Sequence, residues 1–173
     1  MGFRAAAPFG DSVAVDGNTT VNYACGNAIR VAMDRAMKLQ GEAMNARETI
    51  TLYEAIGGAD AVGRLVRRFY ELMDTLPEAA RCRAVHPADL TGSEAKFRDY
   101  MTGYLGGPPV YVEKHGHPRL RMRHMPAPIG PEERDEWLLC FRRALEETVP
   151  DIRLRGVIMP PIEKLAYHMQ NRN

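Results

Sequence analysis

Hydrophobic residues recur at helical spacing in several stretches between residue 59 and the end of the chain. Within 59–75 the apolar side chains stand three or four residues apart, which places them on one face of a helix. This first stripe consists of Val62, Leu65, Val66, Phe69, Leu72 and Met73. Later stripes comprise Phe97, Tyr100, Met101, Tyr104 and Leu105, then Trp137, Leu138, Cys140, Phe141, Ala144 and Leu145, and finally Ile162, Leu165, Ala166 and Met169. Because no segment alternates as a strand does, the pattern predicts an all-α domain.

Prolines mark most of the expected helix ends. Pro77 should end the first long helix and Pro150 the third. Proline suits a first helical position, because the nitrogen it occupies has no intrahelical partner there. Pro131 therefore predicts the start of the third helix, and Pro160 with Pro161 predicts the start of the last one.

Capping residues and glycines predict the remaining boundaries. Thr91 and Glu94 fit a capping box, which would start the second long helix. Gly106–Pro109 should stop that helix, and Gly57 with Gly58 should stop a short helix over 52–56. The segment 78–90 reads as irregular or as a short turn.

The first 48 residues differ in composition from the rest. Residues 1–22 show no sustained period and read as a weakly ordered tail. Apolar residues in 27–44 recur at near-helical spacing and predict an amphipathic helix. That helix could pack on the domain, pair with another chain in a homo-oligomer, or lie on the surface without chemistry. We therefore expect an N-terminal extension over 1–48 and a compact domain over 49–173.

Charge and cysteine content exclude several classes of function. The chain has 23 Lys and Arg against 22 Asp and Glu, so nothing in its charge favours nucleic acid or a membrane surface as partner. Cys25, Cys82 and Cys140 form no CxxC pair, which argues against a disulfide framework and a zinc ribbon. No apolar run is long enough for a membrane span, and the N-terminus lacks a signal-peptide pattern, so we expect a cytoplasmic protein.

His124 is the strongest candidate for a ligand. Pro118 and Pro126 bracket the segment that carries it, and the residue before a proline is disfavoured in helical conformation. Met125 should therefore end a helix of about two turns. Imidazole is the commonest metal ligand in proteins and the proximal ligand of globin haem. The alternative is a structural histidine.

Tyr70 and Trp137 are candidates for donors to a bound ligand. Each carries one polar hydrogen on an apolar body, and such a group needs a partner when it is buried. The alternatives are a tyrosine at the edge of the core and a tryptophan that only fills it.

Two other readings of the basic and histidine-rich segment stay open. His115, His117 and His124 could form a zinc or copper cluster, although zinc usually takes three or four ligands. Arg119 and Arg123 share a helix face, so either could pair with a carboxylate, and otherwise both are solvated surface charges.

The residues of this region resemble the truncated haemoglobins of the second group. The resemblance rests on Gly106-Gly107-Pro108 with Tyr111, on Gly116-His117-Pro118-Arg119-Leu120-Arg121-Met122-Arg123-His124, and on Glu133-Arg134-Asp135-Glu136-Trp137-Leu138. It covers 49–148 closely and 157–170 loosely, and it does not reach the first 48 residues.

The resemblance implies a two-over-two helical sandwich around haem b (iron protoporphyrin IX), with His124 as the proximal iron ligand. It implies distal donors at Tyr70 and Trp137, and it places His86 where relatives carry tyrosine or histidine. The other implied cofactor contacts are Ser93, Phe97, Phe69 and Met101, with Arg119 or Arg123 for the propionates. Relatives usually carry an aromatic residue where this chain has Ala127, which implies looser packing on the proximal side.

The resemblance implies tight binding of dioxygen and other diatomic ligands at a pentacoordinate iron. Oxidation of nitric oxide or reduction of peroxide, supported by an unidentified reductase, would fit the same donors, and the resemblance does not decide whether the protein is an enzyme. One alternative is a haem-based gas or redox sensor that uses the helix over 27–44 as its output element. Another is a haem-free helical adaptor.

Overall fold

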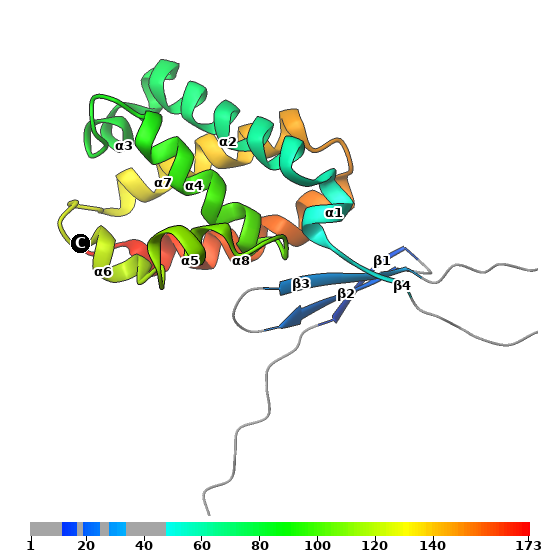
Figure 1. Cartoon of the computed structure of the whole chain (residues 1–173). Coiled ribbons are helices and arrows are strands. Elements are labelled where there is room, and N and C mark those ends of the chain that lie inside the picture. The colour runs from blue at the N-terminus through cyan, green and yellow to red at the C-terminus, as the bar shows by residue number, and fades with distance from the viewer. Residues whose placement is uncertain (1–11, 17–18, 25–27, 34–47) are drawn as a thin grey trace, which may run out of the picture.

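The computed structural model describes residues 12–16, 19–24, 28–33 and 48–173 (Figure 1). Its strands are β1 (Ser12–Asp16), β2 (Thr19–Ala24), β3 (Ala28–Met33) and β4 (Glu48–Thr51). Its helices are α1 (Leu52–Ile56), α2 (Gly58–Thr75), the 3-10 turn η1 (Pro77–Ala79), α3 (Ala80–Ala84), α4 (Thr91–Tyr104), α5 (Val110–His115), α6 (Leu120–His124), α7 (Pro131–Thr148) and α8 (Ile152–Met169). From residue 52 onward every described element is helical, which confirms the all-α prediction for this part of the chain.

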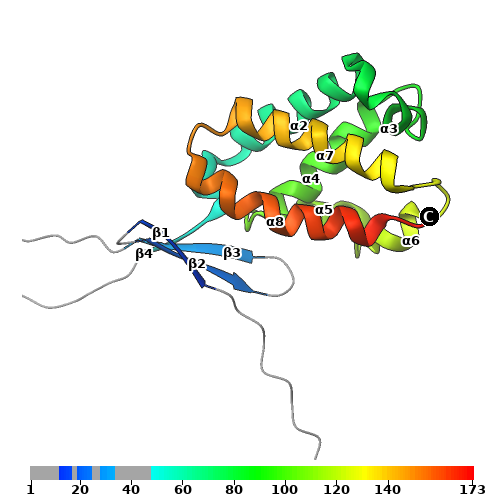
Figure 2. The same cartoon turned by 180° about the vertical axis from the view of Figure 1, so that it is seen from behind.

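The long helices form two layers that enclose the core. Figures 1 and 2 show α2 and α7 in the upper layer, α8 with α5 and α6 in the lower layer, and α4 between them. The helix faces predicted from the apolar stripes are the buried ones. Phe69 of α2 and Phe141 of α7 are fully buried and lie 6.2 Å apart between ring centroids. Burial of two such aromatic side chains contributes about 1.5–3 kcal/mol each to stability.

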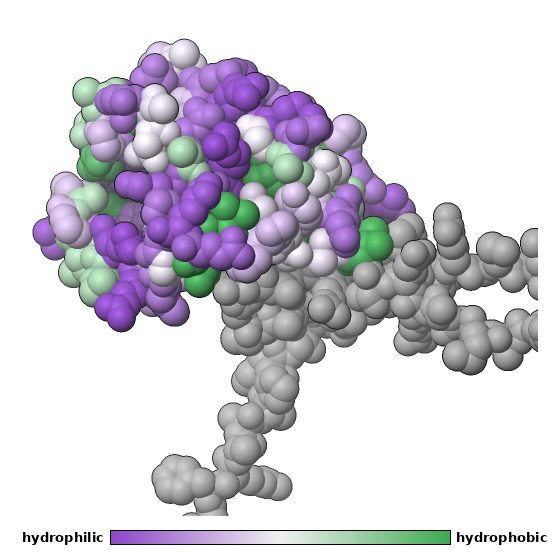
Figure 3. Space-filling model, in the orientation of Figure 1, coloured by the Kyte–Doolittle hydropathy of each residue, from purple (hydrophilic) through white to green (hydrophobic). Residues whose placement is uncertain are grey.

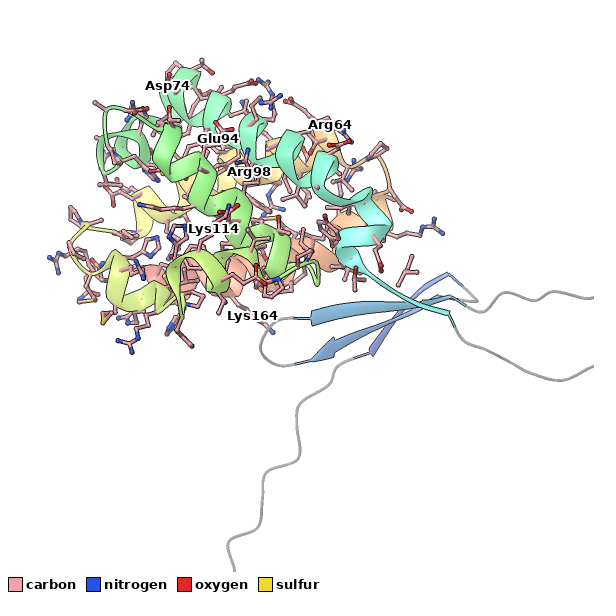
Figure 4. The ribbon with its side chains drawn as sticks, viewed as in Figure 1. Arg64, Asp74, Glu94, Arg98, Lys114 and Lys164 are labelled. Carbon is pink, nitrogen blue, oxygen red and sulfur yellow. The ribbon has the colours of Figure 1, made fainter. Side chains whose placement is uncertain are left out.

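Ion pairs join neighbouring helices at the rim of this core. Arg68 of α2 pairs with Glu147 of α7, with 2.5 Å between Nε and Oε2. Lys114, labelled in Figure 4, reaches from α5 to α4, where its Nζ lies 2.9 Å from Oδ2 of Asp99. The Arg68 pair is largely exposed and contributes little. Asp99 is buried, so its pair with Lys114 fixes the position of the short helix α5 on α4.

The structure corrects two predicted helix starts. The capping box is not at Thr91, because α4 begins there with Leu90 as its N-cap and no side-chain bond. The box forms at Thr51 instead, where the Glu54 carboxylate accepts from the Thr51 N–H at 2.7 Å. The last helix does not begin at Pro160, since α8 starts at Ile152 and contains both prolines.

Packing explains why α8 continues through Pro160 and Pro161. An internal proline costs about 3 kcal/mol in an isolated helix, because it removes a donor and crowds the preceding turn. Val157 and Ile158 before the prolines and Ile162 after them are all buried in the same core. Their burial offsets the local cost.

Three short helical elements also form where the sequence shows no helical pattern. From Pro77 into the segment 78–90, which the sequence predicts to be irregular, η1 and α3 form consecutive turns, and α5 follows the predicted stop at Gly106–Pro109. Each has at most six residues, too few to show a period.

The described part of the N-terminal region is a sheet, so the helix predicted over 27–44 is wrong at residues 28–33. The four strands pair antiparallel in the order β1-β2-β3-β4. Val31 of β3 lies opposite Val21 of β2 and Ile50 of β4. Residues 34–44 of the predicted helix and most of the predicted tail lie outside the described residues. The division into 1–48 and 49–173 stays a prediction.

The visible surface carries no large hydrophobic area. Figure 3 shows hydrophilic residues over most of this face, with hydrophobic residues in small separate patches. Among the described helices, none is long and apolar enough to cross a membrane.

Gly107→Ala should destabilise the protein by about 1–3 kcal/mol, the usual range for overpacking. A Cβ at Gly107 would lie 2.8 Å from the Tyr53 ring and 2.9 Å from the Thr102 carbonyl oxygen. Gly63→Ala is the matched control, because a Cβ there meets nothing within 4 Å and alanine favours a helix by about 0.5–1 kcal/mol. Urea unfolding of both variants tests this. Equal stability of the two would contradict the close approach at Gly107.

Candidate functional site

A cavity of about 560 Å³ lies between the two helical layers. Its walls come from α2, α3, α4 and α7 on one side and from α5, α6 and α8 on the other. Figures 1 and 2 agree that α3 and α6 lie at opposite heights of the domain. Seven of the nine residues predicted for the site line this cavity: Tyr70, His86, Ser93, Phe97, Arg123, His124 and Trp137.

Met101 and Arg119 do not line the cavity. Met101 is fully buried in the core, as is Phe69, which the resemblance also placed near the cofactor. Arg119 is exposed, and its backbone has φ of 41°, a left-handed conformation that non-glycine residues seldom adopt. It turns the chain into α6, and its N–H donates to Nδ1 of His117 at 3.1 Å.

The orientation of the His124 ring is fixed by a bond within its own helix. Its Nδ1 lies 2.7 Å from the carbonyl oxygen of Leu120. A carbonyl oxygen can only accept, so Nδ1 is the donor in this bond. The bond leaves Nε2 as the ring nitrogen that can bind a metal, and His124 lines the cavity.

The C-terminal segment holds α6 in place. The amide Nδ2 of Asn171 donates to the His124 carbonyl at 3.1 Å and to the Ala127 carbonyl at 2.9 Å. Arg121 of α6 donates to the carbonyls of His168 and Gln170. Since α6 has five residues and none of them is buried, these contacts from 168–171 stabilise its position.

His86 presents a second imidazole to the cavity. Its Nδ1 lies 2.7 Å from the Cys82 carbonyl oxygen, so it too carries the proton on Nδ1. Burial lowers the pKa of His86, with a further lowering from nearby Arg83 and His124, against the opposing effect of the Cys82 bond. His86 is therefore neutral at pH 7, and its Nε2 can accept a hydrogen bond but not donate one.

Tyr70 and Trp137 supply donors on the wall that faces His124. Burial raises the pKa of Tyr70, so its phenol keeps its proton. Tyr70 lies edge-to-face with His86, with 6.2 Å between ring centroids. Within the described part of the chain, neither the Tyr70 hydroxyl nor the Trp137 indole N–H bonds another residue, so both can donate into the cavity.

Several polar residues of the cavity were not predicted for it, among them Glu133 and Arg134 of α7. Lys96 of α4 lines it, as do the phenols of Tyr100 and Tyr111. The sequence showed Tyr100 only as part of an apolar stripe and Lys96 as one more surface charge. The α4 spacing could have indicated both, because residues 93, 96, 97 and 100 share one helix face.

The alternative of a zinc or copper cluster finds no support. Among the described residues, no group of three or more His, Cys, Asp or Glu side chains is placed to hold a metal ion. His124 faces the cavity, but His117 bonds the Arg119 backbone and His115 is exposed.

Comparison with known proteins agrees with this geometry. The family model described as "Bacterial-like globin" matches residues 51–171. The chain belongs to the bacterial-like globins. A relative named group 2 truncated hemoglobin YjbI, from Bacillus subtilis, is 40% identical over 120 residues, which are 69% of this chain and 88% of that protein. Within the family, the chain is thus a group 2 truncated haemoglobin, as the sequence predicted.

Solved structures of similar globins share the fold. The group II 2-on-2 hemoglobin of the plant pathogen Agrobacterium tumefaciens is 73% identical, with a TM-score of 0.73 over 74% of this chain and 99% of that one. The truncated oxygen-avid haemoglobin of Bacillus subtilis is 40% identical, with a TM-score of 0.64 over 70% of this chain and 99% of that one. Membership of this family implies a haem cofactor.

Asn171→Ala should make the globin lose haem faster, by about tenfold. Each hydrogen bond contributes about 0.5–1.5 kcal/mol. The variant removes the bonds from Asn171 Nδ2 to the carbonyls of His124 and Ala127 and the bond from the Ile129 N–H to Asn171 Oδ1, so the combined loss can exceed the 1.4 kcal/mol that corresponds to about tenfold. Transfer of haem to an excess of apo-myoglobin measures the rate. Asn173→Ala, at the exposed end of the chain, is the control and should behave as the unmodified protein. An unchanged rate for Asn171→Ala would show that α6 is held by other contacts.

Proposed function

We propose that this globin binds haem b in the cavity with His124 as the proximal ligand, leaves the iron pentacoordinate and holds dioxygen tightly. The observation that carries the proposal is that His124, with its Nδ1 bonded to the Leu120 carbonyl, lines one wall of the cavity, while the donors Tyr70 and Trp137 line the other.

The residues present fit a haem. A flat apolar ring suits walls built largely from aromatic and aliphatic side chains, among them Phe97 and Leu120. The two carboxylates of a haem need cations, and Lys96 and Arg123 line the cavity. Arg123 has one long bond, 3.4 Å to the His115 carbonyl, so its guanidinium can pair with a propionate. We thus assign the propionate contact to Arg123 with Lys96, and not to Arg119.

Haem supplies, when bound, a ferrous iron with one open position for a diatomic ligand. The chain supplies the donors around that position. A dioxygen held there would carry partial negative charge, and hydrogen bonds to a charged acceptor contribute about 1.5–3 kcal/mol each. Tyr70 and Trp137 can both donate to such an acceptor, whereas neutral His86 has no proton on Nε2 and cannot. Two donors slow release by orders of magnitude, since each 1.4 kcal/mol is about tenfold.

Slow release suits chemistry at the iron better than bulk transport. We propose that the physiological reaction is oxidation of nitric oxide by held dioxygen or reduction of peroxide, with electrons from a separate reductase. The helix suggested as output element of a sensor is a strand at residues 28–33, residues 34–44 lie outside the described residues, and the sensor alternative stays a prediction.

His124→Ala should abolish stable haem retention. The variant removes the imidazole nitrogen that faces the cavity from α6. Haem content and the absorption spectrum of the reduced protein measure the effect. His117→Ala is the matched control, since His117 does not line the cavity. Normal haem content with an unchanged ferrous spectrum in His124→Ala would refute the ligand assignment.

Trp137→Phe should speed oxygen release by about tenfold or more, because it removes one donor to a charged acceptor. Phenylalanine keeps much of the bulk that packs against Phe141, where the two rings stack 5.4 Å apart. Carbon monoxide carries less negative charge, so its release should change less. Stopped-flow measurement of both rates separates the effects. An equal change for both ligands would mean that Trp137 acts by size.

A further inference from the structure

Two aromatic clusters line the cavity. One extends into the buried core, and the other extends toward the surface. The first surrounds Trp137, whose ring neighbours are Phe69, Phe97 and Phe141, at centroid distances of 5.1, 5.8 and 5.4 Å. These neighbours belong to or pack against the buried core. Phenylalanine is much harder to oxidise than tyrosine or tryptophan. If Trp137 were oxidised to a radical, none of these ring neighbours could therefore reduce it and pass the oxidation on.

The second cluster consists of tyrosines and leads outward. Tyr100 lines the cavity and stacks on Tyr104, one helical turn further along α4, with 5.6 Å between ring centroids. Tyr100 also lies edge-to-face with Tyr111 of α5 at 6.0 Å. Tyr111 lines the cavity as well, and its ring is 5.0 Å from that of the exposed His115.

The position of this cluster between α4 and α5 is well fixed. Lys114 bridges to the buried Asp99 at 2.9 Å, which joins the two helices beside the tyrosines. Tyr104 is half-buried, so its ring is partly open to solvent at the end of α4. Burial raises the pKa of Tyr100, with smaller effects from Tyr104 and Tyr111, so the phenol is protonated until it is oxidised.

We propose that Tyr100 and Tyr104 form a relay that carries electrons from a small phenol at the surface to the cofactor cavity, with Tyr111 as a second cavity-facing member. This inference rests on the proposed peroxide-reducing function. Peroxide takes two electrons and two protons to give two waters, and two phenol molecules supply them, each leaving as a phenoxyl radical. Tyr100 gives an electron to the oxidised cofactor and a proton to cavity water. Tyr104 then restores Tyr100, and the external phenol restores Tyr104.

The relay would allow a phenol to be oxidised at the surface of the protein, which the cavity alone does not allow. A phenol at the surface need not enter the cavity, whose space the cofactor fills. Tyr70 also faces the cavity, but its aromatic neighbours are Phe69, Phe97 and His86, none of which continues to a tyrosine. Among the described aromatic contacts, the route through Tyr100 is therefore the one that joins the cavity to a solvent-accessible phenol.

The test uses the full chain loaded with zinc protoporphyrin, so that it does not depend on peroxide chemistry. A light flash with hexaammineruthenium(III) as quencher removes one electron from the porphyrin, and its radical cation is followed by transient absorption. A nitroso spin trap with peptide mass spectrometry locates the protein radical. We expect the unmodified protein to show rapid decay of the cation and a spin adduct on Tyr104.

Tyr100→Phe should slow this decay several-fold and remove the adduct on Tyr104. Tyr104→Phe should keep the fast initial decay and lose the surface adduct, which tests the relay even if Tyr100→Phe folds poorly. Tyr167→Phe is the matched control, because Tyr167 is exposed and packs on Arg134 outside the cluster.

Unchanged decay and labelling in Tyr100→Phe, or an adduct confined to Trp137 or Tyr70, would overturn the relay. Failure of the chain to bind zinc protoporphyrin would instead overturn the proposed cofactor site. An intact relay in a protein inert to peroxide would overturn only the proposed reaction.

Discussion

The hydrogen bond from His124 Nδ1 to the Leu120 carbonyl is the interaction on which the site depends. It fixes both the tautomer and the direction of the imidazole. That bond can form only while α6 is helical, and a helix of five residues is not stable by itself. The bonds from Asn171 and Arg121 between α6 and the segment at the end of α8 therefore help to set the position of His124, which lies 47 residues before Asn171.

On the opposite wall of the cavity, His86 makes the same kind of hydrogen bond as His124, but its surroundings differ. His86 also donates its Nδ1 proton to a carbonyl four residues back, at the same 2.7 Å as His124. His124, however, stands on an exposed helix, whereas His86 is half-buried and its pKa is lowered by burial. His124 thus presents its ring to the cavity from an exposed helix, and His86 presents a neutral Nε2 that can only accept a hydrogen bond. The two imidazoles make equivalent hydrogen bonds, so the difference between them comes from burial: α6 is exposed, whereas the surroundings of His86 are half-buried.

The sequence predicted the features whose cause is local. The apolar spacing located α2, α4 and α7, and the prolines at 118 and 126 bounded α6. Features that depend on tertiary contacts could not be predicted from the spacing of apolar residues or from prolines. Thr51-Leu-Tyr-Glu54 and Thr91-Gly-Ser-Glu94 have the same capping pattern, yet only the first forms the box. Thr91 already lies inside its helix, because Asp89 accepts its N–H at 2.9 Å and Leu90 accepts the N–H of Glu94.

Two buried thiols lie beside or near the cavity. Cys82 lines the cavity, and Cys140 is fully buried in α7. Burial raises the pKa of Cys82, and it raises the pKa of Cys140 to about 11. The thiolate is the reactive form, so both thiols remain protonated and slow to react at neutral pH. Tyrosine is different, because it loses its proton as it gives up an electron and needs no prior ionisation. Burial therefore lowers the reactivity of the two thiols, while it leaves the phenols around the cavity able to take part in the proposed electron transfer.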